Sequence, residues 1–282
     1  MQSMLKVEKN QDMDIDKFSH FFFKAGRRQL KSDMIRCYNN LENIKNEDQM
    51  KNFVEDLYKK NNTKIDLIIG KIRKYVEHID PHLWRIIENL MNEKFDSEYF
   101  LYPTMLPMSP YGKKHFNLSI MQNVFTGEEV DQFGINKTSV HELSHILFYK
   151  KMERLFSAET HEELAKKMGV NIRSMDGLKE IYASIIQNHP KMRKFFPNRV
   201  RGNKEYGLIT VKYKNHIMRI EDYFIEKYME NEGLYSNRDE LDKEMVKLLK
   251  KIDKEFSNKL EIYNTVDQRA FIQKGLFNPI MV

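Results

Sequence analysis

The chain has 282 residues, of which 41% are hydrophobic and 12% aromatic, so it can bury a substantial core and its composition excludes a disordered protein. Its 47 basic and 41 acidic residues give a formal net charge of +6. Because the two signs are interleaved, we interpret the surface as generally solvated rather than as a dedicated anion-binding face. Cys37 is the only cysteine, which excludes an intrachain disulfide and a cysteine-based metal site.

Residues 1–97 are expected to form a helical region after a polar, loosely held start over 1–16. Apolar residues recurring at helical spacing predict helices over 17–41, 47–60 and 64–78. Asp80-Pro81 predicts the start of another helix, because aspartate caps a helix N-terminus and proline suits its first position.

An extended region is expected after residue 98. Three of the seven prolines fall between Pro103 and Pro110, which indicates irregular extended structure. Residues 115–120 alternate partly between polar and apolar, which predicts a strand with one buried face. Further helices are expected over 138–154, 159–168, 175–188, 212–231 and 237–260, with a loop and possible hairpin over 196–211.

The predicted helix over 138–154 contains the sequence His141-Glu142-Leu-Ser-His145. In an H-E-x-x-H pattern the two histidines lie four residues apart and share a helix face, where they can bind zinc, while the glutamate acts as a general base. Ser139 and Glu142 also satisfy the S-x-x-E capping box, so a non-catalytic helix start is the alternative.

A zinc site needs a third protein ligand. No histidine follows at the metzincin spacing, so a downstream carboxylate is expected, with Glu180 and Glu221 as candidates. On helical geometry Glu180 shares a largely solvated face, whereas Glu221 shares an almost wholly apolar one. Because a carboxylate among apolar residues is costly unless it is paired or metal-bound, we favour Glu221. A buried ion pair between Glu221 and an arginine or lysine is the alternative.

H-E-L-S-H followed by I-E-D-x-x-I-E resembles a group of predicted zinc metallopeptidases found in bacteriophages and beside von Willebrand factor A-type proteins. The resemblance covers roughly residues 115–230, with matches in the second motif at Ile220, Glu221, Asp222, Ile225 and Glu226. It implies a gluzincin-like enzyme with Glu221 as the third ligand. Met218 and Phe224 depart from the asparagine and arginine of the group.

We therefore expect a mainly α fold with a small β-sheet (α+β) and a zincin-like core. The expected segments are a helical region over 1–97, the core over 98–234 and a helical segment over 235–282, with one compact domain as the alternative. The function expected is hydrolysis of peptide bonds in a protein or peptide substrate, with Zn²⁺ on His141, His145 and Glu221 and with Glu142 as general base.

Two alternatives to a peptidase remain. One is an inactive, zinc-stabilised interaction module of a phage or mobile element, and the other, less favoured, is nucleic-acid binding through basic helices. No signal peptide and no membrane-spanning run is apparent, so we expect no membrane partner and a cytoplasmic protein, in the host cytoplasm if phage-encoded. Tyr149, His216 and Tyr223 are candidates for an oxyanion donor, and the oligomeric state is not predicted.

Overall fold

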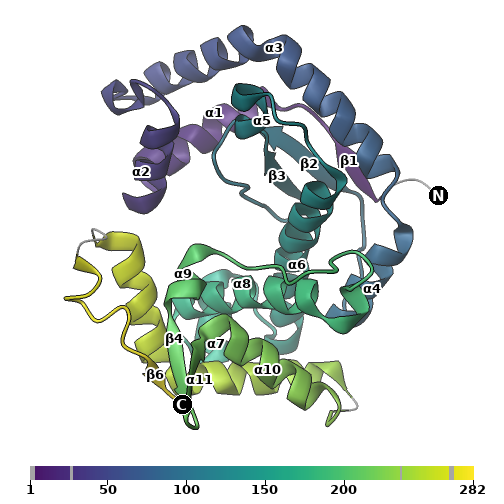
Figure 1. Ribbon diagram of the computed structural model, residues 1–282, viewed down its shortest axis with the longest axis vertical. Helices are drawn as coiled ribbons and strands as arrows, with labels where there is room; N and C mark the ends of the chain where they lie inside the picture. Colours follow the sequence, from purple (N-terminus) through teal and green to yellow (C-terminus); the bar gives the residue numbers. More distant parts are fainter. Residues whose placement is uncertain (1–3, 26–27, 236, 267–269) are drawn as a thin grey trace. The chain divides into compact units, whose positions relative to one another are not determined.

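The computed structural model (Figure 1) confirms a mainly α chain with a small amount of β-structure. It describes residues 4–25, 28–235, 237–266 and 270–282. The chain is 64% helical, and the described residues form two three-stranded sheets.

The chain divides into two units. One comprises residues 1–80 with 96–142, and the other 81–95 with 143–282. The units are divided after residues 80, 95 and 142, whereas the segments expected from the sequence have boundaries after residues 97 and 234. The division falls between Glu142 and Leu143, inside one continuous helix.

The first unit contains a parallel sheet in the order β1-β2-β3. Its elements are β1 (Leu5–Val7), α1 (Gln11–Ser19), the π-helix η1 (His20–Lys24), α2 (Arg28–Cys37), the 3-10 turn η2 (Leu41–Asn43), α3 (Glu47–Glu77), β2 (Tyr99–Thr104), β3 (His115–Ser119) and α5 (Met121–Thr126). The strand predicted over 115–120 is confirmed as β3, but Phe116, Asn117 and Leu118 are all buried, so both of its faces are covered instead of one. The outer edge of β3 is partly paired with its own chain, since Asn117 donates to the Pro110 carbonyl at 2.7 Å.

The two helices predicted over 47–60 and 64–78 are one helix, α3. The polar run from Asn61 to Thr63 suggested a break, but Asn61 Nδ2 donates to the Leu57 carbonyl oxygen at 2.8 Å within the helix. Tertiary packing of the apolar face outweighs the weak helix propensity of these three residues.

The second unit is built around α8 (Ile172–Asn188), which contacts α7 (His161–Met168), α10 (Ile220–Glu232) and α11 (Arg238–Thr265). The other elements of this unit are α4 (Pro81–Met91), part of α6 (Gln132–Phe156), the 3-10 turn η3 (Pro190–Met192), α9 (Lys204–Leu208), β4 (Thr210–Tyr213), β5 (His216–Arg219) and β6 (Ile280–Met281). The helix start at Pro81 and the helix end at Gly169, which has a φ of +67°, are confirmed.

The helix predicted over 212–231 is wrong in its first eight residues. β4 and β5 form an antiparallel hairpin there, with Tyr213 opposite His216, and α10 begins only at Ile220. The short alternation of polar and apolar residues fits either structure, and Lys214, with a φ of 54°, supplies the backbone geometry that a tight turn needs.

Candidate metal centre

α6 carries both histidines and the glutamate of the H-E-x-x-H pattern. The helix begins at Gln132, well before the predicted residue 138, so Ser139 lies inside it and the capping-box interpretation is wrong. His145 and Glu142 are buried, with relative exposures of 2% and 6%, and His141 is half-buried. A polar face of α6 is therefore turned inward.

Glu180 joins these histidines from α8. Its Oε2 atom lies 3.3 Å from Nε2 of His145. One ligand atom from each of His141, His145 and Glu180 lies within 4.8 Å of the others. No other group of three or more potential metal-ligating side chains is found among the described residues.

The expectation that Glu180 shares a solvated face is wrong. Ala183, Ser184 and Gln187, which share that face, are each at most 1% exposed. They are small or polar residues, which suggested solvent, but α8 is enclosed by three other helices of its unit. Residue type along one helix does not reveal how many neighbours pack against it.

Glu221 is buried but does not belong to the cluster. The apolar face assigned to it assumed that Ile217 and Met218 were helical, whereas both lie in β5, where Ile217 is 65% exposed. Glu221 stands in the first turn of α10, and its Oε1 accepts a hydrogen bond from the Gly202 N–H at 3.0 Å. The geometry therefore favours Glu180 over Glu221 as the third ligand.

The carboxylate of Glu180 is held by further side chains. Lys179 Nζ lies 2.9 Å from Oε1, and Asn203 Nδ2 donates to Oε2 at 3.0 Å. One turn along both helices, the Tyr149 hydroxyl donates to Asp176 at 2.5 Å, so the tyrosine proposed as an oxyanion donor is engaged with α8.

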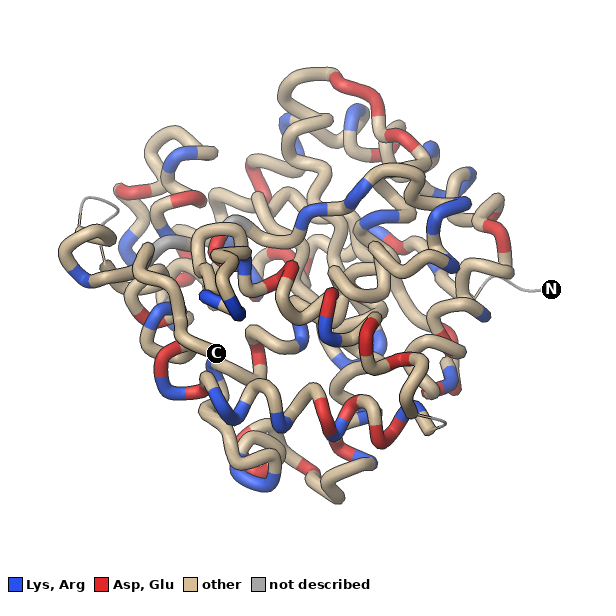
Figure 2. Tube along the Cα trace, turned by 60° about the horizontal axis from the view of Figure 1, so that its bottom comes forward, with Lys and Arg blue, Asp and Glu red and all other residues tan. Residues whose placement is uncertain are grey.

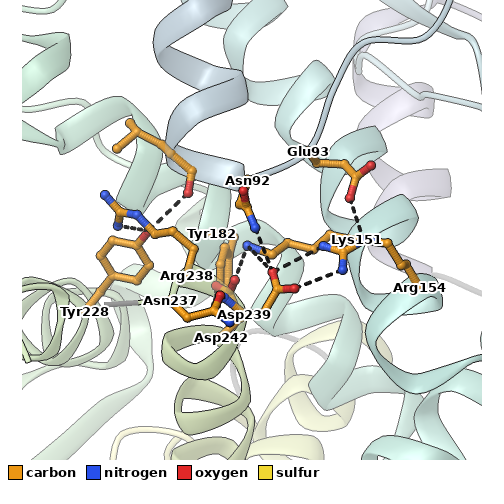
Figure 3. Close-up of polar contacts among 11 residues, drawn as sticks. Asn92, Glu93, Lys151, Arg154, Tyr182, Tyr228, Asn237, Arg238, Asp239 and Asp242 are labelled. Carbon is orange, nitrogen blue, oxygen red and sulfur yellow. Dashed lines mark hydrogen bonds and ion pairs between the residues drawn. The ribbon is translucent and has the colours of Figure 1, made fainter. Parts of the chain in front are cut away.

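A buried ion pair links α6 to α11, and a hydrogen bond from α8 joins it. Lys151 of α6 pairs with Asp242 of α11, and both side chains are 1% exposed (Figure 3). The Tyr182 hydroxyl, from α8, donates to Asp242 at 2.6 Å. Arg154 extends the cluster, since it bonds Asp239 through both terminal nitrogens. This network fixes the relative positions of α6, α8 and α11, and hence of His145 and Glu180.

The cluster is compatible with a bound metal ion, and its two imidazoles and one carboxylate are a donor set that zinc accepts. Zinc is bound by histidine nitrogens and carboxylate oxygens at about 2.0–2.2 Å, which places two tetrahedral ligands about 3.4 Å apart. The separation of 3.3 Å between His145 Nε2 and Glu180 Oε2 matches this requirement. Since Oε2 is the oxygen that lies 3.3 Å from His145 Nε2, Glu180 would bind through that atom.

The comparisons with known proteins add no relative. A scan of family models, a search of curated proteins and a search of solved structures each returned no match. In the part of the chain that the structure describes, no helix has the length and apolar character that crossing a membrane requires.

Proposed function

We propose that this chain is a zinc-dependent hydrolase of peptide bonds, with zinc held by His141, His145 and Glu180. The observation that carries the proposal is the convergence of these three side chains from α6 and α8, with Glu142 adjacent to His141. Two imidazoles and one carboxylate leave a fourth position open, as a catalytic rather than a structural zinc site does.

Glu142 performs the proton transfers. Zinc, when bound, supplies the Lewis acidity that lowers the pKa of a water molecule and polarises a substrate carbonyl. The Glu142 carboxylate accepts the proton of the attacking water and then donates it to the leaving amine nitrogen, so that the side chain is regenerated. Burial of Glu142 at 6% exposure limits competition from bulk water for that proton.

The test combines metal content with hydrolysis. Purified chain loaded with zinc should hold one zinc ion and cleave fluorescent casein or a quenched peptide library. Glu142→Gln should keep the zinc and lose about 10²- to 10⁴-fold in rate, the usual contribution of a general base. Glu153→Gln, farther along α6, is the matched control and should retain the wild-type rate. Unchanged hydrolysis by Glu142→Gln would overturn the assignment.

The same assay separates the enzyme from an inactive, zinc-stabilised interaction module. Such a module would bind zinc and melt at a higher temperature with it, yet wild-type protein would cleave no peptide in the library. Nucleic-acid binding is not favoured, because basic and acidic residues are interspersed along the chain (Figure 2). We assign the protein to the cytoplasm, of the host if it is phage-encoded, since a chain with one cysteine suits a reducing compartment.

A further inference from the structure

The Glu180 oxygen that faces His145 also receives a hydrogen bond from outside the cluster. Asn203 Nδ2 lies 3.0 Å from Oε2, the atom that is 3.3 Å from His145 Nε2. Lys179 occupies the other carboxylate oxygen at 2.9 Å. The Asn203 amide therefore fixes the rotation of the carboxylate and leaves the remaining direction of Oε2 for the metal position.

Asn203 belongs to a segment that is tied down at its neighbours. Asn188, the last residue of α8, bonds both backbone groups of Val200: its Oδ1 accepts the Val200 N–H at 2.9 Å and its Nδ2 donates to the Val200 carbonyl at 2.8 Å. Two residues on, the Gly202 N–H donates to Glu221 Oε1 at 3.0 Å. The backbone on the N-terminal side of Asn203 is thus anchored to α8 and to α10.

Gly202 packs so closely against these helices that position 202 has no room for an amino acid with a side chain. A Cβ atom there would be 2.7 Å from Glu221 Oε1 and 2.7 Å from Ser184 Oγ, both shorter than real Cβ contacts. Ser184 follows Glu180 by one turn of α8. Because glycine has no side chain, the segment can approach α8 closely enough for the next residue, Asn203, to reach Glu180.

We propose that Asn203 is a positioning residue for the metal ligand Glu180, and that Glu221 positions Asn203 by holding the Gly202 backbone. This inference rests on the proposed zinc site. It gives the buried Glu221 carboxylate a role one step removed from the metal, as a hydrogen-bond acceptor. Outer hydrogen bonds of this kind orient metal ligands, and their loss typically weakens metal binding by about 10- to 100-fold.

The experiment measures zinc affinity of the full chain by competition with a chromogenic chelator. Asn203→Ala, Glu221→Ala and Gly202→Ala should each weaken zinc binding by about 10- to 100-fold. Glu221→Gln should restore wild-type affinity, because its amide oxygen can still accept the Gly202 N–H. Asn264→Ala is the matched control, since this asparagine makes a comparable bond to the Leu260 carbonyl within α11.

Melting of the metal-free variants separates positioning from folding. Asn203 is exposed, so without zinc the Asn203→Ala variant should have the same melting temperature as the wild type. With zinc present, its melting temperature should be lower than that of the wild type. Wild-type zinc affinity in Asn203→Ala would overturn this inference alone, and equal weakening by Glu221→Gln and Glu221→Ala would overturn the step through Gly202. A wild-type chain that binds no zinc, or a Glu180→Ala variant that binds it normally, would overturn the proposed site and this inference with it.

Discussion

Nε2 of His145 lies 3.3 Å from Oε2 of Glu180, a contact between residues that are 35 positions apart in the sequence. One turn later on α6, Tyr149 reaches Asp176, one turn earlier on α8. The two contacts run in opposite directions along the helices, so α6 and α8 are antiparallel here and share a polar row. A row of this kind inside a helical unit is the feature on which the proposed chemistry depends.

Glu180→Ala should abolish stoichiometric zinc binding, whereas Glu221→Gln should not. The first variant removes the carboxylate next to His145, and the second keeps an acceptor for Gly202. Metal content after dialysis against zinc-free buffer measures both. Zinc retained by Glu180→Ala and lost from Glu221→Gln would reinstate Glu221 as the ligand.

Lys151→Met should destabilise the fold by about 3–5 kcal/mol, because it leaves Asp242 buried without its cation. The double variant Lys151→Met/Asp242→Leu should recover most of that loss, since it removes both charges together. Urea unfolding of the two variants and the wild type gives the comparison. A single variant as stable as the wild type would show that the pair contributes nothing.

Gly177→Ala should cost about 1–3 kcal/mol through overpacking. A Cβ at residue 177 would lie 2.6 Å from Cζ of Phe256, where α8 meets α11. The matched control is Gly70→Ala in α3, where a Cβ meets nothing within 4 Å. That change should stabilise the chain by about 0.5–1 kcal/mol, because alanine favours helix over glycine. The midpoints of urea unfolding should move in opposite directions.

His189 should make stability fall in mild acid. Burial lowers the pKa of His189, with Arg238 and Lys191 adding to the effect and Glu232 opposing it. The ring also accepts the Lys191 N–H at Nδ1, and protonation would break that bond. Between the lowered pKa and the unfolded value of about 6.5, the unfolded state binds more protons, so stability declines as pH falls through this window.

The measurement is the free energy of unfolding of the wild type and of His189→Gln between pH 8 and pH 5. The free energy of unfolding of the wild type should exceed that of His189→Gln at pH 8, and this excess should shrink as the pH falls to 5. His78→Gln, at an exposed histidine, serves as the control and should follow the wild-type curve. A constant difference across the range would show that His189 does not titrate differently on folding.

Local signals in the sequence were enough for much of the fold. Periodic apolar residues predicted the mainly helical character, and Pro81 and Gly169 correctly marked a helix start and a helix end. Local signals were insufficient where the structure of a segment depends on neighbours that are distant in the sequence. The run from Asn61 to Thr63 stays helical because α3 packs as one unit, and residues 210–219 form a hairpin although their pattern also suits a helix.

The pairing of His141 with His145 was determined by the sequence itself, because four residues of helix bring two side chains onto one face whatever surrounds them. The partner of that pair was decided only by tertiary structure. Glu180 meets His145 because α8 packs antiparallel to α6, and Glu221 turns to Gly202 because a hairpin precedes α10. Which side chains become buried, and which elements lie close together, depend on the packing of the whole unit. The spacing of residues within one helix does not reveal either.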